Sequence, residues 1–332
     1  MRKEWLARII LVVLVVAAVT LPLGAWWSRN RGVILHARMA ETGGWTPENL
    51  TVEAGQPLHL RLTSDDVLHG FAVGQSDQPP VDIYPGEVTE VTLTFDKPGK
   101  YTFYCTRWCS ANHWRMRGTI EVTGPETANE PVQPPLYVTL NIDIDAPHKT
   151  DIVPELTPSA RRGENLQAAI PDEFQDQAYY RSHSPVELWQ ALREKASLAS
   201  LSDQDLWDMV ALVWRSNTTP QDLGVGQQLY TANCAACHGV EGDGNGVFAD
   251  GLDPSEAGDH AAMQPGEMTQ RPTDFTDPRL MLAASPALLQ GKIVRGGMGT
   301  GMPYWGPIFT DEQTWALVDY LWTFQFDLEN EP

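Results

Sequence analysis

The sequence predicts a multidomain protein with an N-terminal transmembrane helix, an all-β sandwich and an all-α C-terminal domain. Three observations indicate this order: an apolar stretch at the N-terminus, short alternating segments over residues 45–122, and amphipathic helical periods after residue 182. The length of 332 residues is enough for about two domains with additional segments. We expect five parts: residues 1–31, 32–124, 125–181, 182–217 and 218–328.

Residues 1–31 are predicted to be a membrane anchor. Residues 5–27 are almost wholly apolar apart from Arg8, and this stretch is long enough to span a bilayer. The basic residues near the start favour an N-terminus on the inner side, and Trp26 and Trp27 suit the outer interface. A cleaved signal peptide is the alternative, although the segment is long for one. We therefore expect a single-pass protein of the cytoplasmic (inner) membrane, in contact with lipid, whose soluble domains lie on the periplasmic side.

The charge balance argues against nucleic acid as a partner. The formal net charge is -20, so the phosphates of a nucleic acid would be repelled. The same charge would steer a basic partner toward the protein, although a solvated exported surface explains it equally well.

Residues 32–124 are predicted to form the all-β domain. Alternating stretches such as 58–62 and 101–104 are separated by turn sequences such as Lys97-Pro-Gly-Lys. The pattern is typical of a small sandwich. Residues 125–181 are rich in Pro, Glu, Asp and Gln and show only one possible strand, at 136–142, so a linker is expected there.

Residues 182–217 are predicted to be one half of an internal repeat. Ser184-Pro and the run 201–214 return as Ser285-Pro and the run 309–322. Each copy has Ser or Thr at a helix cap, followed by an amphipathic run. We interpret the first copy, which lacks cysteine, as a helical brace that packs against the second copy or docks a partner; chance similarity of two common helical patterns is the alternative.

The segment from Cys105 to Met116 has the spacing C-x-x-x-C-x-x-x-H-x-x-M directly after a strand. A mononuclear blue-copper site uses one thiolate, two imidazoles and a weak axial Met, so the second thiolate, Cys109, indicates a second metal. Two thiolates can bridge two coppers, each of which then needs one imidazole, and His113 and the upstream His69 can supply these. A zinc site or a disulfide is the alternative, but neither gives Met116 or His69 a role. We predict a binuclear copper site.

Residues 45–122 resemble the CuA domain of subunit II of haem–copper oxygen reductases, which has a cupredoxin fold. The resemblance is carried by Asp66-Val-Leu-His69-Gly-Phe, Tyr84-Pro-Gly-Glu-Val, Lys97-Pro-Gly-Lys-Tyr, the copper loop and Met116-Arg-Gly-Thr-Ile. The resemblance implies that Cys105 and Cys109 are bridging thiolates and that His69 and His113 are terminal ligands. It also implies two weak ligands, Met116 and the backbone carbonyl of Arg107.

Two details qualify this resemblance. The single anchor and the Gly-Thr-Ile ending resemble the B-type oxidases more than the two-helix A-type subunit. Many oxidases carry Glu where Arg107 stands, and that Glu helps to hold a magnesium ion against subunit I. The magnesium site is therefore in doubt in this chain.

The sequence Cys234-Ala-Ala-Cys237-His238 is a c-type haem attachment motif, in which the two thiols form thioethers and the histidine is the proximal iron ligand. A metal-binding turn is the alternative. Residues 220–326 resemble a cytochrome c domain, and the segment 182–217 then resembles a degenerate, haem-less half of one. We expect Met302 as the distal ligand, because Pro303 follows it and nearby glycines let the backbone approach the haem; Met298 is the alternative.

Together, the two domains resemble the fused subunit II of caa-type cytochrome c oxidases. The resemblance implies an electron-entry subunit that passes electrons from an external donor through haem c and CuA to subunit I, where oxygen is reduced; the chain itself would hold no catalytic residue. The donor would be a cytochrome c, a cupredoxin or a quinol-oxidising complex. Alternatives are a subunit of a CuA-containing nitric oxide reductase and a free-standing anchored redox carrier. Nitrous oxide reductase is excluded, because its four-copper cluster needs many histidines and the chain has 8.

Overall fold

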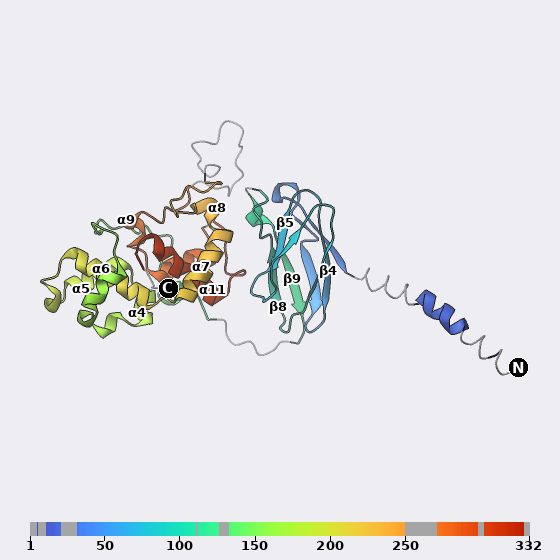
Figure 1. The fold of residues 1–332 in the computed structure, drawn as a ribbon, viewed down its shortest axis with the longest axis horizontal. Coiled ribbons are helices and arrows are strands. Elements are labelled where there is room, and N and C mark those ends of the chain that lie inside the picture. Colours follow the sequence, from blue (N-terminus) through green and yellow to red (C-terminus); the bar gives the residue numbers. More distant parts are fainter. Residues whose placement is uncertain are drawn as a thin grey trace, which may run out of the picture.

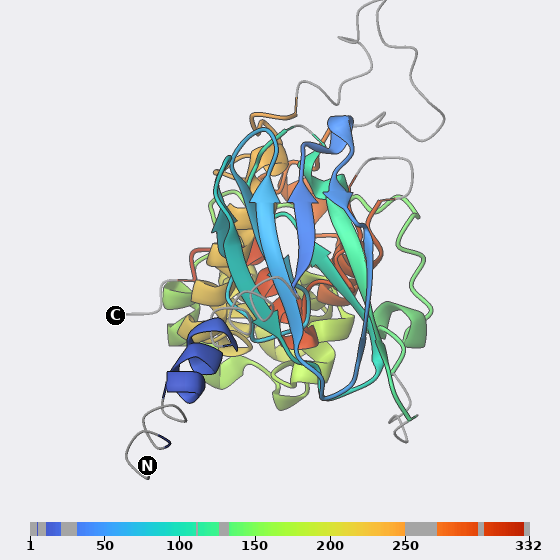
Figure 2. The ribbon, with the colours of Figure 1, turned by 90° about the vertical axis from the view of Figure 1, so that its right-hand side faces the viewer.

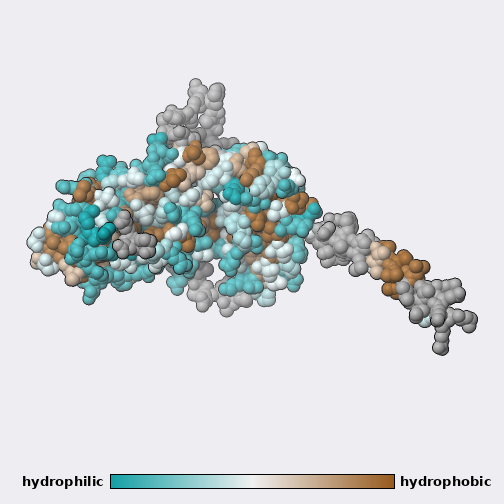
Figure 3. Space-filling view, viewed as in Figure 1, coloured by the Kyte–Doolittle hydropathy of each residue, from teal (hydrophilic) through white to brown (hydrophobic). Residues whose placement is uncertain are grey.

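A β-sandwich and a helical domain lie side by side (Figure 1). The computed structural model describes residues 5, 11–20, 32–110, 112–125, 133–249, 271–297 and 302–328. Residues 11–20 are helical and their large apolar side chains are exposed, which makes this part of the surface hydrophobic (Figure 3). Among the described residues, no helix is long and apolar enough to cross a membrane. The expected anchor, residues 1–31, falls mostly outside the described residues.

The sandwich consists of two sheets, as the alternating sequence predicts, and it covers one side of the helical domain (Figure 2). The sheets have the orders β2-β1-β4-β7 and β3-β9-β8-β5-β6. In β4, alternate side chains point into the core, as the period of two along a strand requires. Trp45, Phe71 and Phe103 meet at the centre with ring centroids 5.6–5.9 Å apart. The strands are β1 (Val33–Ala37), β2 (Trp45–Thr46), β3 (Asn49–Glu53), β4 (Leu58–Ser64), β5 (His69–Val73), β6 (Val81–Ile83), β7 (Thr89–Leu93), β8 (Gly99–Tyr104) and β9 (Arg117–Thr123).

The strand register determines where the copper loop, residues 105–116, begins and ends. Tyr104 at the end of β8 pairs with Arg117 at the start of β9, so the loop leaves and re-enters the sheet at neighbouring points. A hydrogen bond from the amide of Cys105 to the carbonyl of Met116, 3.0 Å long, closes its base. Strand β5 pairs with β8 through Ala72 and Tyr104, which brings the beginning of β5 toward the loop.

The C-terminal domain is helical, as predicted. Helices α7 and α11 pack against each other, and Gly226 permits this, since a Cβ atom there would lie 2.1 Å from the carbonyl oxygen of Ala316. The main helices are α4 (Gln177–Ser182), α5 (Pro185–Arg193), α6 (Asp203–Ser216), α7 (Pro220–Asn233), α8 (Ala235–His238), α9 (Pro278–Met281), α10 (Pro286–Arg295) and α11 (Asp311–Leu321). Shorter helical turns are η5 (Ala196–Leu198) and η7 (Trp322–Phe324) in this domain, and η1 (Ala40–Thr42) and η2 (His113–Arg115) in the sandwich.

The segment predicted as a linker, residues 125–181, differs from that expectation. Its described part contains short helical turns, and helix α2 stands where a strand was expected. Ile144, Phe174 and Tyr180 are buried in the core of the helical domain, and the Tyr180 hydroxyl donates a 2.6 Å hydrogen bond to Asp319. The apolar residues are too far apart to give a helical period, yet each anchors the chain to this core. The turns are α2 (Leu136–Thr139), α3 (Ala160–Gly163), η3 (Glu164–Ala169) and η4 (Asp172–Phe174).

The two copies of the repeat form two capped helix pairs. Ser184 and Ser202 cap α5 and α6 with capping boxes, and Ser285 and Thr310 cap α10 and α11. The copies also touch, because Trp214 packs edge-on against its repeat equivalent Trp322 with ring centroids 5.6 Å apart. This contact agrees with the interpretation that the first copy packs against the second.

The sandwich and the helical domain are in direct contact. The backbone amide of Gln75 donates a 2.9 Å hydrogen bond to the carbonyl of Ile308. The adjacent Gly74 packs closely against the same segment, since a Cβ atom there would lie 2.5 Å from the carbonyl oxygen of Pro307. Arg117 donates a 2.7 Å hydrogen bond to the carbonyl of Tyr304 and lies over its ring. The copper loop therefore lies beside the domain that carries the Cys-x-x-Cys-His motif.

Candidate copper and haem sites

Sulfur and nitrogen atoms converge inside the copper loop. The Sγ atoms of Cys105 and Cys109 are 3.9 Å apart and not bonded, and Nδ1 of His69 is 3.9 Å from the Cys105 sulfur. These three ligand atoms lie within 4.8 Å of one another, the only such group of at least three among the described residues. The Met116 sulfur is 3.3 Å from the Cys109 sulfur, and the carbonyl of Arg107 is 3.3 Å from the Cys105 sulfur. The structure thus brings together five of the six residues predicted to bind copper.

His113, the sixth, is buried beside these sulfurs. It is 2% exposed, and neither ring nitrogen has a hydrogen-bond partner of ordinary geometry. The ring nevertheless lies near enough to Cys105 to help lower the pKa of that thiol. A buried imidazole without a partner is unfavourable unless something binds it, and a metal ion would do so. This orphaned ring is the observation that fits a second copper ligand at His113.

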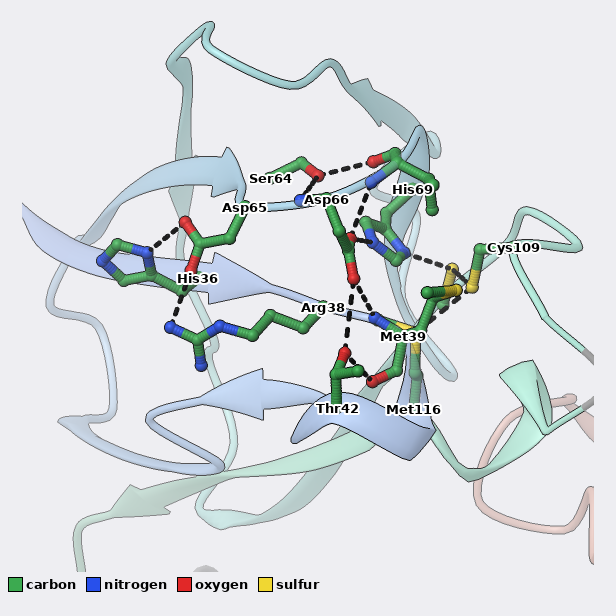
Figure 4. A network of polar contacts seen from close by, with 12 residues as sticks. His36, Arg38, Met39, Thr42, Ser64, Asp65, Asp66, His69, Cys109 and Met116 are labelled. Carbon is green, nitrogen blue, oxygen red and sulfur yellow. Dashed lines mark hydrogen bonds and ion pairs between the residues drawn. The ribbon is translucent and has the colours of Figure 1, made fainter.

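A carboxylate orients the other imidazole (Figure 4). Nε2 of the fully buried His69 lies 2.7 Å from Oδ1 of Asp66, so Nδ1 is the nitrogen left to face the thiols. Asp66 is itself held by the amides of Met39 and Val67, at 2.8 and 2.7 Å. Burial opposes protonation of the ring, but Cys105 and Asp66 outweigh it and raise the pKa of His69. Such an outer partner holds a ligand histidine in one orientation.

The two thiols affect each other's ionisation. The hydrogen bond from the Cys109 side chain lowers the pKa of Cys105, although burial opposes the charged form. The same pairing raises the pKa of Cys109 above its usual range. The pairing thus favours the thiolate at Cys105, and binding of metal, which requires deprotonated thiols, would release the proton of Cys109.

The side chain of Arg107 points to a partner within the sandwich. Its Nε and Nη2 atoms donate to the two carboxylate oxygens of Asp82, each over 2.8 Å. This bidentate pair holds the residue whose carbonyl faces the Cys105 sulfur. Asp82 was not singled out by the sequence analysis, because it lies on β6, outside the recognised motifs.

The haem motif starts where α7 ends and includes all of α8. Cys234 is the C-cap of α7, and Cys237 and His238 lie on the single turn of α8. Nδ1 of His238 is 3.1 Å from the carbonyl of Thr273, which can only accept, so Nδ1 carries the proton and Nε2 is left for a metal. The ring stacks on Phe275 with centroids 4.6 Å apart. Burial lowers the pKa of His238, which favours the neutral ring that binds iron.

The predicted distal ligand lies at the edge of the helical core. Met302 packs against this core, and its carbonyl accepts a 3.1 Å hydrogen bond from the amide of Gly297. The alternative, Met298, lies outside the described residues. Met281 is only 1% exposed within the apolar core.

Two family descriptions match the chain, one for each domain. Residues 44–123 match the periplasmic domain of cytochrome c oxidase subunit II, and residues 225–325 match cytochrome c. The resemblance predicted from the sequence is confirmed. The chain joins a cupredoxin-like domain similar to that of cytochrome c oxidase subunit II to a cytochrome c domain. These matches support a role in electron transport.

Three similar proteins each cover about a quarter of this chain. Cytochrome c oxidase subunit 2 of Thermus thermophilus is 39% identical over 79 residues, covering 24% of this chain and 58% of that protein. Nitrous-oxide reductase of Stutzerimonas stutzeri is 32% identical over 79 residues, covering 23% of this chain and 12% of that protein. The periplasmic domain of oxidase subunit II of Bradyrhizobium japonicum is 25% identical, with a TM-score of 0.22, covering 23% of this chain and 55% of that structure. The chain thus spans about half the length of the curated oxidase subunits that it matches.

Proposed function

We propose that this chain is the electron-entry subunit of a haem–copper oxygen reductase, which accepts electrons from an external donor and delivers them to a catalytic subunit I. The observation that carries the proposal is the pair of unbonded thiols, 3.9 Å apart, with two buried imidazoles beside them, in the same chain as a c-type haem motif. Both centres supply one-electron chemistry, and the catalytic reduction of oxygen belongs to the partner.

Copper fits the donor set of the loop better than zinc does. Cys105 and Cys109 would bridge two coppers, and His69 and His113 would bind one copper each. The thioether of Met116 and the carbonyl of Arg107 would be the weak ligands. Zinc prefers four strong ligands and gives the thioether no role, whereas thioether and thiolate together suit copper.

The haem would be held through Cys234 and Cys237, with His238 and Met302 on the two faces of the iron. The hydrogen bond from His238 to Thr273 holds the ring in one tautomer. Thioether ligation by Met302 would raise the reduction potential and leave no open position for oxygen. The haem would then be an electron carrier.

Metal analysis of the purified full chain with electron paramagnetic resonance tests the copper assignment. We expect two coppers and one haem per chain, with a hyperfine pattern of one electron shared by two coppers. His113→Ala should lose this pattern, whereas His59→Ala, on the exposed side of β4, should keep it. One copper per chain with a mononuclear pattern would show that the binuclear assignment is wrong.

Substitution of the methionines tests the distal ligand. Met302→Ala should lose the weak near-infrared sulfur-to-iron band, lower the haem potential and bind carbon monoxide when reduced. Met281→Ala should keep the band, because Met281 is part of the apolar core. If the band survives in Met302→Ala and disappears in Met298→Ala, the ligand is Met298.

The partner and the location belong to the same proposal. The apolar segment 5–27 would anchor the chain in the inner membrane, with both domains on the periplasmic side, and the net charge of -20 would attract a basic donor. Purification from native membranes should yield the chain together with a haem–copper subunit I. A chain recovered alone would favour a free-standing carrier, and a copurifying subunit that reduces nitric oxide would favour a nitric oxide reductase.

A further inference from the structure

One side chain of the copper loop reaches across the domain interface. Trp108 lies between Arg107 and Cys109, and its Nε1–H donates a 3.1 Å hydrogen bond to the carbonyl of Ala232. Ala232 lies in the last turn of α7, two residues before Cys234. The indole therefore joins the segment that bears the copper thiolates to the segment that bears the haem thiols.

The same indole also contacts a copper ligand. Its ring lies against the imidazole of His113 with centroids 3.9 Å apart and the planes tilted by 52°. Phe248, which follows the haem motif, lies 5.5 Å away from the indole. Trp108 thus touches His113 on one side and the haem domain on the other, and it is peptide-bonded to Cys109.

We propose that Trp108 is the bridge through which electrons pass between the haem and the copper pair, an inference that rests on the proposed function. The route runs from Cys234 along the backbone to the carbonyl of Ala232, two residues earlier in the chain. It then crosses the hydrogen bond to the indole and continues to Cys109 and His113. One electron leaves the ferrous haem, which becomes ferric, and arrives on the oxidised copper pair. No bond forms or breaks, no proton moves, and the indole keeps its own electrons.

Bonded atoms and short hydrogen bonds couple two redox centres better than gaps do, and another interdomain hydrogen bond beside the copper loop offers a rival route. That contact runs from Arg117 to the carbonyl of Tyr304 and begins beside Met116, the weak copper ligand. The Trp108 route instead begins at a bridging thiolate and at a strong imidazole ligand. The two contacts can be separated by substitution.

The experiment measures electron equilibration between the centres in the full, metal-loaded chain after a photochemical pulse of reductant. Trp108→Phe keeps a ring against His113 but loses the hydrogen bond, and Trp108→Leu loses both. We expect the rate to fall in that order, with Trp108→Leu at least about tenfold slower, which corresponds to about 1.4 kcal/mol in activation free energy. The matched control is Trp189→Leu, since Trp189 also donates to a backbone carbonyl, that of Asp203, away from both sites.

Each result decides between the hypotheses. Unchanged rates in both Trp108 variants, with unchanged potentials, would overturn the bridge, as would a larger loss in Arg117→Gln than in Trp108→Leu. If Trp108→Leu fails to bind copper, the rate of Trp108→Phe decides. If the wild-type chain, with both centres present, shows no equilibration at all, the proposed function fails together with the bridge.

A second readout does not depend on electron transfer. In the ferrous, copper-free chain, the ¹⁵N-labelled indole N–H of Trp108 should exchange slowly with solvent, because the Ala232 carbonyl accepts its hydrogen bond. Exchange at the rate of a free indole would contradict the contact on which the route depends.

Discussion

The copper loop and the haem segment achieve ligand placement in opposite ways. The residues proposed to bind copper come from two separate segments of the chain, but the paired ends of β8 and β9 and the hydrogen bonds around His69 hold them close together. The haem motif is contained in five consecutive residues, yet the groups that contact His238 come from far along the chain, at Thr273 and Phe275. The copper site thus depends on the strand register of the sandwich, and the haem site depends on the packing of the helical domain.

This difference predicts that the two sites can be damaged independently. The largest effect is expected from Trp214→Ala, because Trp214 is fully buried against Trp322 and Phe326. Loss of this ring should lower the free energy of unfolding of the helical domain by about 3–5 kcal/mol. Denaturant unfolding, monitored through the haem absorbance, measures this loss of stability. The electron paramagnetic resonance signal of the copper should stay unchanged. An unchanged midpoint would refute the role of the first repeat copy as a brace.

A matched pair of glycines on α7 gives the next effect. Gly226→Ala would place a methyl group against the Ala316 carbonyl, which is expected to destabilise the helical domain by about 1–3 kcal/mol. Gly224→Ala meets nothing within 4 Å and should be neutral or stabilising by about 0.5–1 kcal/mol. Thermal unfolding of both variants measures the difference, and equal midpoints would contradict the close packing of α7 on α11.

The copper side can be tested with two neighbouring carboxylates. Asp66→Asn removes the charge beside Nε2 of His69 and should weaken copper binding by about 10–100-fold. Asp65→Asn is the control, because Asp65 pairs with His36 and Arg38 and not with a ligand (Figure 4). Competition with a copper chelator measures both affinities. The haem potential and the haem content should be the same in both variants. An equal loss of copper affinity in the two variants would mean that general surface charge is responsible.

The smallest effect is a pH dependence in the helical core. Burial raises the pKa of Asp319 from 3.8 to about 7, while the hydroxyl of Tyr180 donates to it and opposes that rise. The folded chain then holds a proton that the unfolded chain releases, so this group lowers stability as pH rises from about 4 to about 7. Asp319→Asn should remove this part of the slope and still accept from Tyr180. Unfolding midpoints across that range test it; parallel curves for variant and wild type would contradict it.

The sequence predicted the two domains and the copper-loop residues, because alternation, caps and cysteine spacing are local signals. It did not predict the contact of Trp108 with Ala232, since that contact exists only after two domains have docked. The described part of residues 125–181 was misread as a linker because isolated apolar residues, such as Ile144 and Phe174, show no period. Asp82 was missed for a similar reason: its partner Arg107 is 25 positions away.

The contact of Trp214 with Trp322 has a consequence for assembly. Position-equivalent residues that touch each other are what a twofold axis produces between identical subunits. Here both copies belong to one polypeptide, so the association is intramolecular. A noncovalent pair of such modules would separate on dilution, but the covalent pair keeps this contact at any protein concentration.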